Sequence, residues 1–210
     1  MRPYEIGERI GPWCIPREKK MIAALETKYR GIRFRSRLEA RWAVFFDVLG
    51  LSWEYEPEGF STSQGNYRPD FLVDEIGWIE VKPELPSDDA TIQKLVDVGV
   101  HTKKNAYFVN GFKSRKWHDD EHEALRVTFD NRDGSFCEGW DDFHLFCECP
   151  CCGKIGLQFE GRDERIHGDP WGKRSRVVSA RIHRALDAAR GAVVDRSGIV
   201  HHDYRSLKNG

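Results

Sequence analysis

The sequence predicts an α/β fold in which helices flank a mixed sheet, followed by a small cysteine-rich extension. Three observations favour this class. Short apolar runs with alternating polarity, typical of strands, are interspersed with segments of helical periodicity. Two of the short runs flank a polar turn, which is the pattern of a β-hairpin. Four of the six cysteines fall between residues 147 and 152, after the alternating part of the chain.

Length and composition limit the possible classes of protein. A chain of 210 residues is one domain, or one domain with a small appendage. The apolar content of 40% and charged content of 32% are typical of a globular protein and exclude a disordered one. No apolar run approaches the roughly 20 residues that span a bilayer, and the N-terminus lacks the apolar core of a signal peptide. We therefore expect a cytoplasmic protein without a membrane partner.

The net charge of -1 means that any surface for a polyanion must be local. Residues 1–29 are expected to form an irregular arm and then a short helix at 17–29, where apolar residues recur at helical spacing. A basic run follows, and it is either a solvated face or a phosphate-contacting surface. Its candidate contact residues are Arg33, Arg35, Arg37 and Arg41.

The strongest helical pattern lies between residues 38 and 49. Apolar residues repeat at steps of three and four, and Gly50 is a natural stop. Ser36 and Glu39 have the spacing of a capping box, in which the Glu side chain returns to the backbone of the cap residue. Glu39 is also next to the packed face of the helix, so its carboxylate could instead reach a metal ion held by the sheet.

The next elements complete the alternation of helices and strands. Strand patterns occur at 51–56, 71–73, 78–81 and 106–109, a polar connector at 57–66, and a second helix at 90–99. The predicted order is helix, strand, strand, strand, helix, strand. Gln93 lies on the second helix.

Charged residues lie within the hairpin predicted for residues 67–82. Side chains alternate faces along a strand, so Glu80 and Lys82 share one face. Asp70 precedes the first strand and comes within reach of Glu80 if the hairpin pairs as its turn indicates. Two carboxylates and one ammonium are therefore expected to converge. A solvent-facing Glu-x-Lys pair is the alternative.

That convergence has a chemical meaning. Magnesium prefers oxygen ligands and usually takes one or two protein carboxylates together with waters and substrate phosphates. Asp70 and Glu80 are suitable ligands for such an ion, which can activate water for attack on phosphorus. Lys82 would then stabilise charge on the attacked phosphate or help the water to lose its proton.

The order of these motifs resembles the PD-(D/E)xK nuclease superfamily, which has the restriction-endonuclease-like fold. The resemblance rests on Glu39 in a helix, Asp70 after Arg-Pro, and Glu80-Val-Lys82 on the following strand. The segments Ser36-Arg-Leu-Glu-Ala-Arg-Trp, Trp53-Glu-Tyr-Glu-Pro and Trp-Ile-Glu80-Val-Lys82 are similar to small endonuclease-like proteins often carried by bacteriophages. The resemblance covers residues 30–112.

The resemblance implies a DNA endonuclease that uses Mg²⁺ or Mn²⁺ to hydrolyse phosphodiester bonds, in the host cytoplasm if the protein is phage-encoded. It assigns Asp70 and Glu80 to the metal, Lys82 to catalysis and Glu39 to an assisting role. DNA is the implied partner, Gln93 a substrate-side residue, and a homodimer is expected where both strands are cut. The alternatives are a catalytically silent DNA-binding or assembly module on the same fold, and a zinc-dependent interaction module.

The cysteine cluster predicts a structural zinc site in the extension. Cys149-Pro-Cys151-Cys152-Gly153 contains a Cys-x-x-Cys pair followed by glycine, a turn that presents two thiolates to one ion. Cys147 offers a competing pair. We expect Cys149, Cys152 and His167 as ligands, with Asp169 as the candidate for the fourth. Reduced thiols without metal and a redox pair are the alternatives.

The extension is expected to end in a basic helix at residues 173–190. It is either a docking helix with a solvated basic face or a second phosphate-contacting surface, with Arg176 and Arg181 as contacts. The predicted organisation is an arm and helix at 1–29, a nuclease core at 30–139 and a zinc-binding, basic-helix extension at 140–210.

Overall fold

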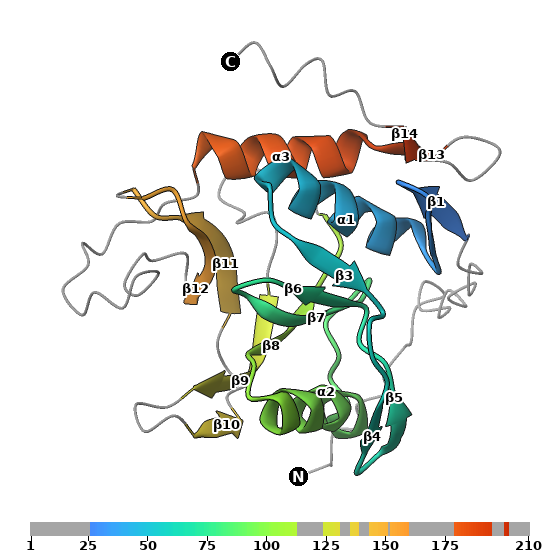
Figure 1. Cartoon of the computed structure of the whole chain (residues 1–210), viewed down its shortest axis with the longest axis vertical. Helices are drawn as coiled ribbons and strands as arrows, with labels where there is room; N and C mark the ends of the chain where they lie inside the picture. Colours follow the sequence, from blue (N-terminus) through green and yellow to red (C-terminus); the bar gives the residue numbers. More distant parts are fainter. Residues whose placement is uncertain are drawn as a thin grey trace, which may run out of the picture.

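The computed structural model describes residues 26–112, 124–130, 135–138, 143–150, 152–159, 179–194 and 200–201. Its helices are α1 (Arg37–Leu49), α2 (Asp89–Thr102) and α3 (Ala180–Gly191). Its strands, shown with the helices in Figure 1, are β1 (Thr27–Tyr29), β2 (Ile32–Phe34), β3 (Trp53–Tyr55), β4 (Phe60–Thr62), β5 (Gly65–Tyr67), β6 (Phe71–Val73), β7 (Gly77–Val81), β8 (Ala106–Val109), β9 (Ala124–Asp130), β10 (Phe136–Glu138), β11 (Phe143–Glu148), β12 (Ile155–Phe159), β13 (Val193–Val194) and β14 (Val200–His201). None of the described helices has the length and apolar character needed to cross a membrane.

The centre of the molecule is a mixed sheet, as the sequence predicts. Its strands follow the order β12-β11-β9-β8-β7-β6-β3, and β10 pairs with β9 as an eighth strand. Strands β7 and β8 are parallel, and the other described pairs in this sheet are antiparallel. The parallel pair is joined by α2, which is the crossover connection that parallel strands require.

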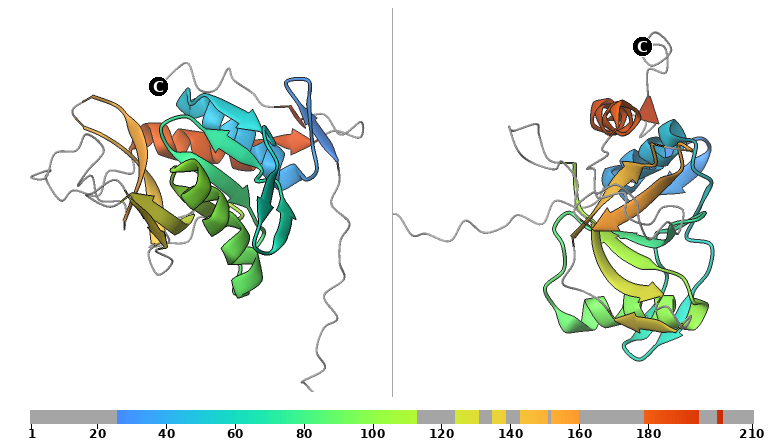
Figure 2. Two further views of the ribbon diagram at one scale, coloured as in Figure 1. Left: turned by 60° about the horizontal axis from the view of Figure 1, so that its bottom comes forward. Right: turned by 90° about the vertical axis from the view of Figure 1, so that its left-hand side faces the viewer.

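Helices cover both faces of this sheet. α1 lies on one face with α3 packed on its outer side, and α2 lies on the opposite face (Figure 2). Alternation along β7 divides its side chains between two cores: Ile79 and Val81 pack towards α1, and Trp78 packs towards α2. Because both faces of β7 are covered, all five of its residues are buried. Glu80, at the charged end of the hairpin, therefore lies in a strand that is packed on both faces.

The strongest sequence predictions for local structure are confirmed. α1 begins after Ser36, whose hydroxyl accepts the Glu39 backbone N–H at 3.2 Å, and ends at Gly50, which has a φ of 68°. A left-handed φ favours glycine at that position. β6 and β7 pair as the expected hairpin, and α2 buries the expected apolar face.

Other expectations are wrong or incomplete. The helix predicted for residues 17–29 does not extend to residue 29, because Thr27–Tyr29 is strand β1, which pairs with β2; residues 17–25 lie outside the described residues. The connector at 57–66 carries most of the β4–β5 hairpin. Of the predicted basic helix, residues 180–190 lie in α3, and residues 173–178 are outside the described part.

The predicted boundary between residues 139 and 140 does not separate two cores. β11 pairs with β9 and so continues the central sheet. α3 packs on α1, and Ile182 and Leu186 belong to the same buried cluster as Phe45. The C-terminal elements therefore share a core with the preceding ones.

Candidate active site

The β6–β7 hairpin brings Asp70 and Glu80 together. The Asp70 backbone N–H donates to Glu80 Oε2 at 3.2 Å. In the opposite direction, the backbone N–H of Val81 donates to Asp70 Oδ2 at 2.8 Å. The register of the hairpin, in which Phe71 lies opposite Ile79, places these groups one position beyond its last paired residues. The predicted proximity of the two carboxylates is confirmed.

Lys82 adds a cation at the same place. Its Nζ lies 2.6 Å from Glu80 Oε1, and its side chain is 35% exposed. Its backbone N–H donates to the carbonyl of Val109 at 2.9 Å, so β8 holds the end of β7 in position. The partly exposed ammonium therefore lies between the buried Glu80 carboxylate and solvent.

Glu39 approaches from the first turn of α1 and has three hydrogen-bond donors. Ser36 Oγ donates to its Oε1 at 2.7 Å. The Arg35 backbone N–H at 3.1 Å and the Tyr55 hydroxyl at 2.6 Å donate to its Oε2. Helix cap and strand β3 together fix this carboxylate, so Glu39 serves as a cap residue and also faces the site.

Arg35 links the carboxylates from the end of β2. Its Nη2 lies 3.2 Å from Asp70 Oδ1 and forms a closer ion pair with Glu56 Oε1. The sequence analysis placed Arg35 among the phosphate contacts, and in the structure it is a cation paired with Asp70. Glu56 has a φ of 47°, and its backbone N–H donates to the Asp70 carbonyl at 2.8 Å.

The site concentrates negative charge in a poorly solvated place. Asp70, Glu80 and Glu39 are only 3%, 4% and 8% exposed. Burial, followed by the charges of Glu80 and Glu39, raises the pKa of Asp70 to about 8, although the Val81 N–H and Arg35 act in the opposite direction. Ionisation of Asp70 is therefore energetically unfavourable in the folded protein, and a bound cation would lower this free-energy cost.

Two tyrosines complete the surroundings. Burial and the hydrogen bond to Glu39 raise the pKa of Tyr55 well above its ordinary range, so Tyr55 remains a donor. Burial and the charge of Glu80 raise the pKa of Tyr67 even further. The Tyr67 hydroxyl is shielded from solvent without a well-formed hydrogen bond among the described residues.

The donor set fits magnesium better than a metal that prefers nitrogen or sulfur. Asp70 and Glu80 supply hard carboxylate oxygens, and the raised pKa of Asp70 indicates a shortage of positive charge. Within the described part of the chain, no group of three or more His, Cys, Asp or Glu side chains is arranged to hold a metal. Two carboxylates match an ion that takes its remaining ligands from water and substrate.

Two of the predicted zinc ligands lie at one turn of the structure. Cys149 and Cys152 lie at the turn between β11 and β12, where the Gly153 N–H donates to the Cys149 carbonyl at 2.8 Å. Cys149 is buried and Cys152 is exposed. His167, Asp169 and Cys151 lie outside the described residues. The zinc site stays a prediction.

Three of the remaining predicted DNA contacts have protein partners of their own in the structure. Arg33 pairs with Glu26 at 3.6 Å, and Gln93 Nε2 donates to Asp97 at 2.9 Å. Arg181 bridges Glu148 and the carbonyls of Leu49 and Gly153, as a structural residue does. Arg37 is exposed and Arg41 is half-buried on α1, whereas Arg176 lies outside the described residues.

Three members of the site have no role predicted from the sequence. Tyr55 and Glu56 belong to the segment Trp53-Glu-Tyr-Glu-Pro and Tyr67 opens the predicted hairpin, but the pattern does not indicate that their side chains meet the carboxylates. The alternation of Trp53-Glu-Tyr-Glu placed Tyr55 and Trp53 on one face, but the partner of that face was not evident from the sequence.

No family model matches the chain, and comparisons with curated proteins and with solved structures likewise found no match. The functional interpretation therefore depends on the residues of the site.

Proposed function

We propose that the protein is a divalent-metal-dependent DNA endonuclease. The observation that carries this proposal is the convergence of Asp70 and Glu80, both buried, with the Lys82 ammonium 2.6 Å from Glu80. Buried carboxylates that share one place are costly unless a cation compensates them. A metal site for phosphodiester chemistry accounts for this cost.

Asp70 and Glu80 would hold Mg²⁺ or Mn²⁺. When bound, such an ion supplies Lewis-acid stabilisation of a phosphoryl oxygen and lowers the pKa of water. In the reaction, a water oxygen forms a bond to phosphorus, one P–O ester bond breaks, and the departing oxygen takes up a proton.

The chain's own residues position the other participants. Lys82 stabilises negative charge on the attacked phosphate or helps the attacking water to lose its proton, since its ammonium is half-exposed and adjacent to Glu80. Arg35 favours the ionised form of Asp70, which is the form that a metal ion requires. Glu39, fixed by Ser36 and Tyr55, adds a third negative charge near the ion.

Asp70→Asn tests the proposal. The full-length variant should show no Mg²⁺-dependent cleavage of circular, linear or branched DNA, while remaining folded by circular dichroism. Asp47→Asn is the matched control, because Asp47 is also a largely buried carboxylate, which accepts hydrogen bonds from Tyr29, Arg30 and Trp53 at the far end of α1. Its cleavage rate should stay close to that of the wild type.

Two outcomes would contradict the proposal. Undiminished Mg²⁺-dependent cleavage by Asp70→Asn would show that Asp70 is not an essential metal ligand. Retention of DNA by the wild type in a gel shift, with no nicking at any concentration of Mg²⁺ or Mn²⁺, would favour the catalytically silent DNA-binding module instead.

A further inference from the structure

A cavity of about 560 Å³ adjoins the carboxylate site on the side of the β4–β5 hairpin. It shares Arg35, the partner of Asp70, with that site. It also shares Tyr67, which ends β5 three residues before Asp70. The cavity is therefore continuous with the place where the attacked phosphate would lie. Its volume is in the range of pockets that hold small organic ligands.

The cavity presents positive charge at its wall. Arg35 and Arg68 both line it, and their side chains are 61% and 58% exposed. Glu56 is the only carboxylate among the lining residues found there, and it faces both guanidinium groups, with 3.8 Å between its Oε2 and Arg68 Nη1. Because Arg35 is also paired with Asp70, the exposed Arg68 guanidinium, 3.8 Å from Glu56, is the cation most available to a ligand. The lining thus favours an anionic ligand.

Aromatic and polar residues also line the cavity. Phe60 and Tyr67 are both among them and are directly opposite each other in the register of β4 and β5. Phe60 is held by an edge-on contact with Trp78, at a centroid distance of 5.2 Å. Asn66 adds an amide group to the same hairpin. Guanidinium groups combined with aromatic rings are the combination by which proteins bind single-stranded nucleic acid.

We propose that this cavity binds an unpaired nucleotide of the DNA strand next to the attacked phosphate. The inference rests on the proposed nuclease function and specifies its substrate class as DNA with a single-stranded position beside the cut. In a duplex the bases are stacked inside the helix, so a base reaches an aromatic pocket only when its strand is unpaired. Arg68 binds the neighbouring phosphate, and Phe60 and Tyr67 contact the base.

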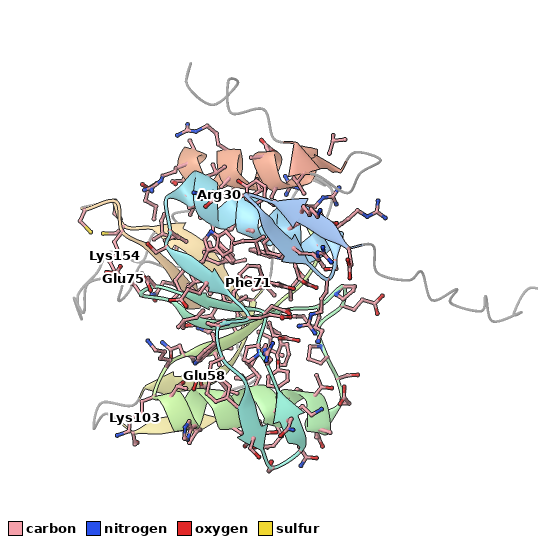
Figure 3. All side chains as sticks on the ribbon, turned by 45° about the vertical axis from the view of Figure 1, so that its right-hand side comes forward. Arg30, Glu58, Phe71, Glu75, Lys103 and Lys154 are labelled. Atoms are coloured by element: carbon pink, nitrogen blue, oxygen red, sulfur yellow. The ribbon has the colours of Figure 1, made fainter. Side chains whose placement is uncertain are left out.

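Two variants and one control test this pocket without cleavage. Arg68→Gln removes the exposed cation. Gly59→Leu fills the cavity from its wall, where an added Cβ would meet Arg68 Nε at 3.7 Å, an ordinary contact. Lys154→Gln is the matched control, since Lys154 is also an exposed cation (42%) paired with a glutamate, Glu75, at the turn end of the β6–β7 hairpin (Figure 3).

The measurement is fluorescence anisotropy of the full-length protein in EDTA with labelled oligothymidine and with a duplex of the same length. The wild type should bind oligothymidine about tenfold more tightly than the duplex, in line with one stacked base. Arg68→Gln and Gly59→Leu should each remove most of this preference, and Lys154→Gln should keep it.

Three results would each overturn the pocket assignment. The wild type could bind both DNAs equally, it could fail to bind oligothymidine, or both pocket variants could keep the wild-type preference. Failure of the nuclease proposal can be distinguished from failure of the pocket assignment. Asp70→Asn lies outside the pocket lining and should keep the preference, whereas its cleavage activity reports on the carboxylate site alone.

Discussion

The Asp70 backbone N–H donates to the Glu80 carboxylate over 3.2 Å, while Asp70's own carboxylate accepts the N–H of the residue that follows Glu80. The two acids are therefore held by the main chain of the hairpin as well as by their side-chain rotamers. Main-chain hydrogen bonds of this kind hold a ligand pair in place before an ion arrives, which is the requirement for a preorganised site.

The raised pKa of Asp70 predicts a pH dependence of stability. Between the ordinary value of 3.8 and the folded value of about 8, the folded state retains a proton that the unfolded state releases. The metal-free protein should therefore lose stability from this group as pH rises through that window. Asp70→Asn has no charge to bury and should show a shallower decline. Melting temperatures measured in EDTA from pH 5 to pH 8 check this.

Mg²⁺ provides the complementary measurement. Because the ion requires the ionised carboxylate, its stabilising effect on the wild type should grow towards pH 8 and should be lost in Asp70→Asn. Parallel pH profiles of the two proteins in EDTA would refute the assignment of the shift to Asp70.

Tyr55→Phe should lower cleavage by about tenfold or more, since a misplaced carboxylate is costly in a catalytic site. The substitution removes the 2.6 Å hydrogen bond to Glu39 and keeps the ring contacts with Phe34 and Phe71. The stability cost should be about 1.5–3 kcal/mol, the range for a hydrogen bond to a charged group. Cleavage kinetics and urea unfolding measure the two effects.

Tyr29→Phe is the control for this experiment. Tyr29 also donates to a carboxylate of α1, that of Asp47, at 2.8 Å, but at the opposite end of the helix. It should cost similar stability and leave cleavage unchanged. An equal loss of activity in both variants would mean that Tyr55 acts only through stability.

The sequence identified the parts of the site that are local in the chain. Asp70, Glu80 and Lys82 lie within one hairpin, so alternation and turn chemistry were sufficient to bring them together. Tyr55 and Arg35 reach the site through the pairing of β3 with β6 and through the helix cap. Such contacts depend on tertiary structure, which alternation within a strand does not encode.

The errors in the fold have similar causes. Residues 27–29 follow a helical pattern of apolar residues, but Thr27 and Tyr29 favour strands and find a partner in β2. The β4–β5 hairpin lies in a stretch whose Gly and Ser residues indicate a connector, and its two-residue turn lacks the usual Asn-Gly signal of a hairpin. The pairing of β11 with β9 joins strands that are not consecutive in the chain, so no turn pattern predicts it.

Metal analysis tests the cysteine turn. The purified full-length protein should contain about one zinc per chain, as a structural site does. Cys149→Ser and Cys152→Ser should each lose the metal and lower the melting temperature, because binding energy at such a site is folding energy. Zinc-free wild-type protein of unchanged stability, after purification without chelators, would refute the site.

Arg181→Ala should destabilise the fold by about 2–3 kcal/mol without changing DNA affinity. Its guanidinium donates to the Leu49 carbonyl at the end of α1, and to Glu148 Oε1 and the Gly153 carbonyl at 3.2 Å each. Removing it leaves three acceptors to be satisfied elsewhere. Lys154→Ala is the control, since its 3.3 Å pair with Glu75 joins two exposed side chains and is worth about 0–1 kcal/mol. A selective loss of DNA binding at unchanged stability would instead restore Arg181 as a contact residue.

Lys82→Met should lower the cleavage rate by about 10²–10³-fold, the range for removing one group that stabilises charge in the transition state. The substitution keeps the length and apolar stem of the side chain, so the β7 strand and its pairing with β8 should be undisturbed. Mg²⁺ affinity should stay equal or increase, because the ammonium 2.6 Å from Glu80 competes with the ion for that carboxylate. Single-turnover cleavage and calorimetric titration with Mg²⁺ separate the two effects.

Lys154→Met provides the reference for this last substitution. Lys154 Nζ lies 3.3 Å from Glu75 in the turn of the same hairpin, so the variant loses an ammonium–carboxylate pair about as completely as Lys82→Met does. A charge effect spread over the whole protein would slow both variants alike. A role at the attacked phosphate slows only Lys82→Met, because electrostatic stabilisation in a poorly solvated site falls off with distance from the reacting group.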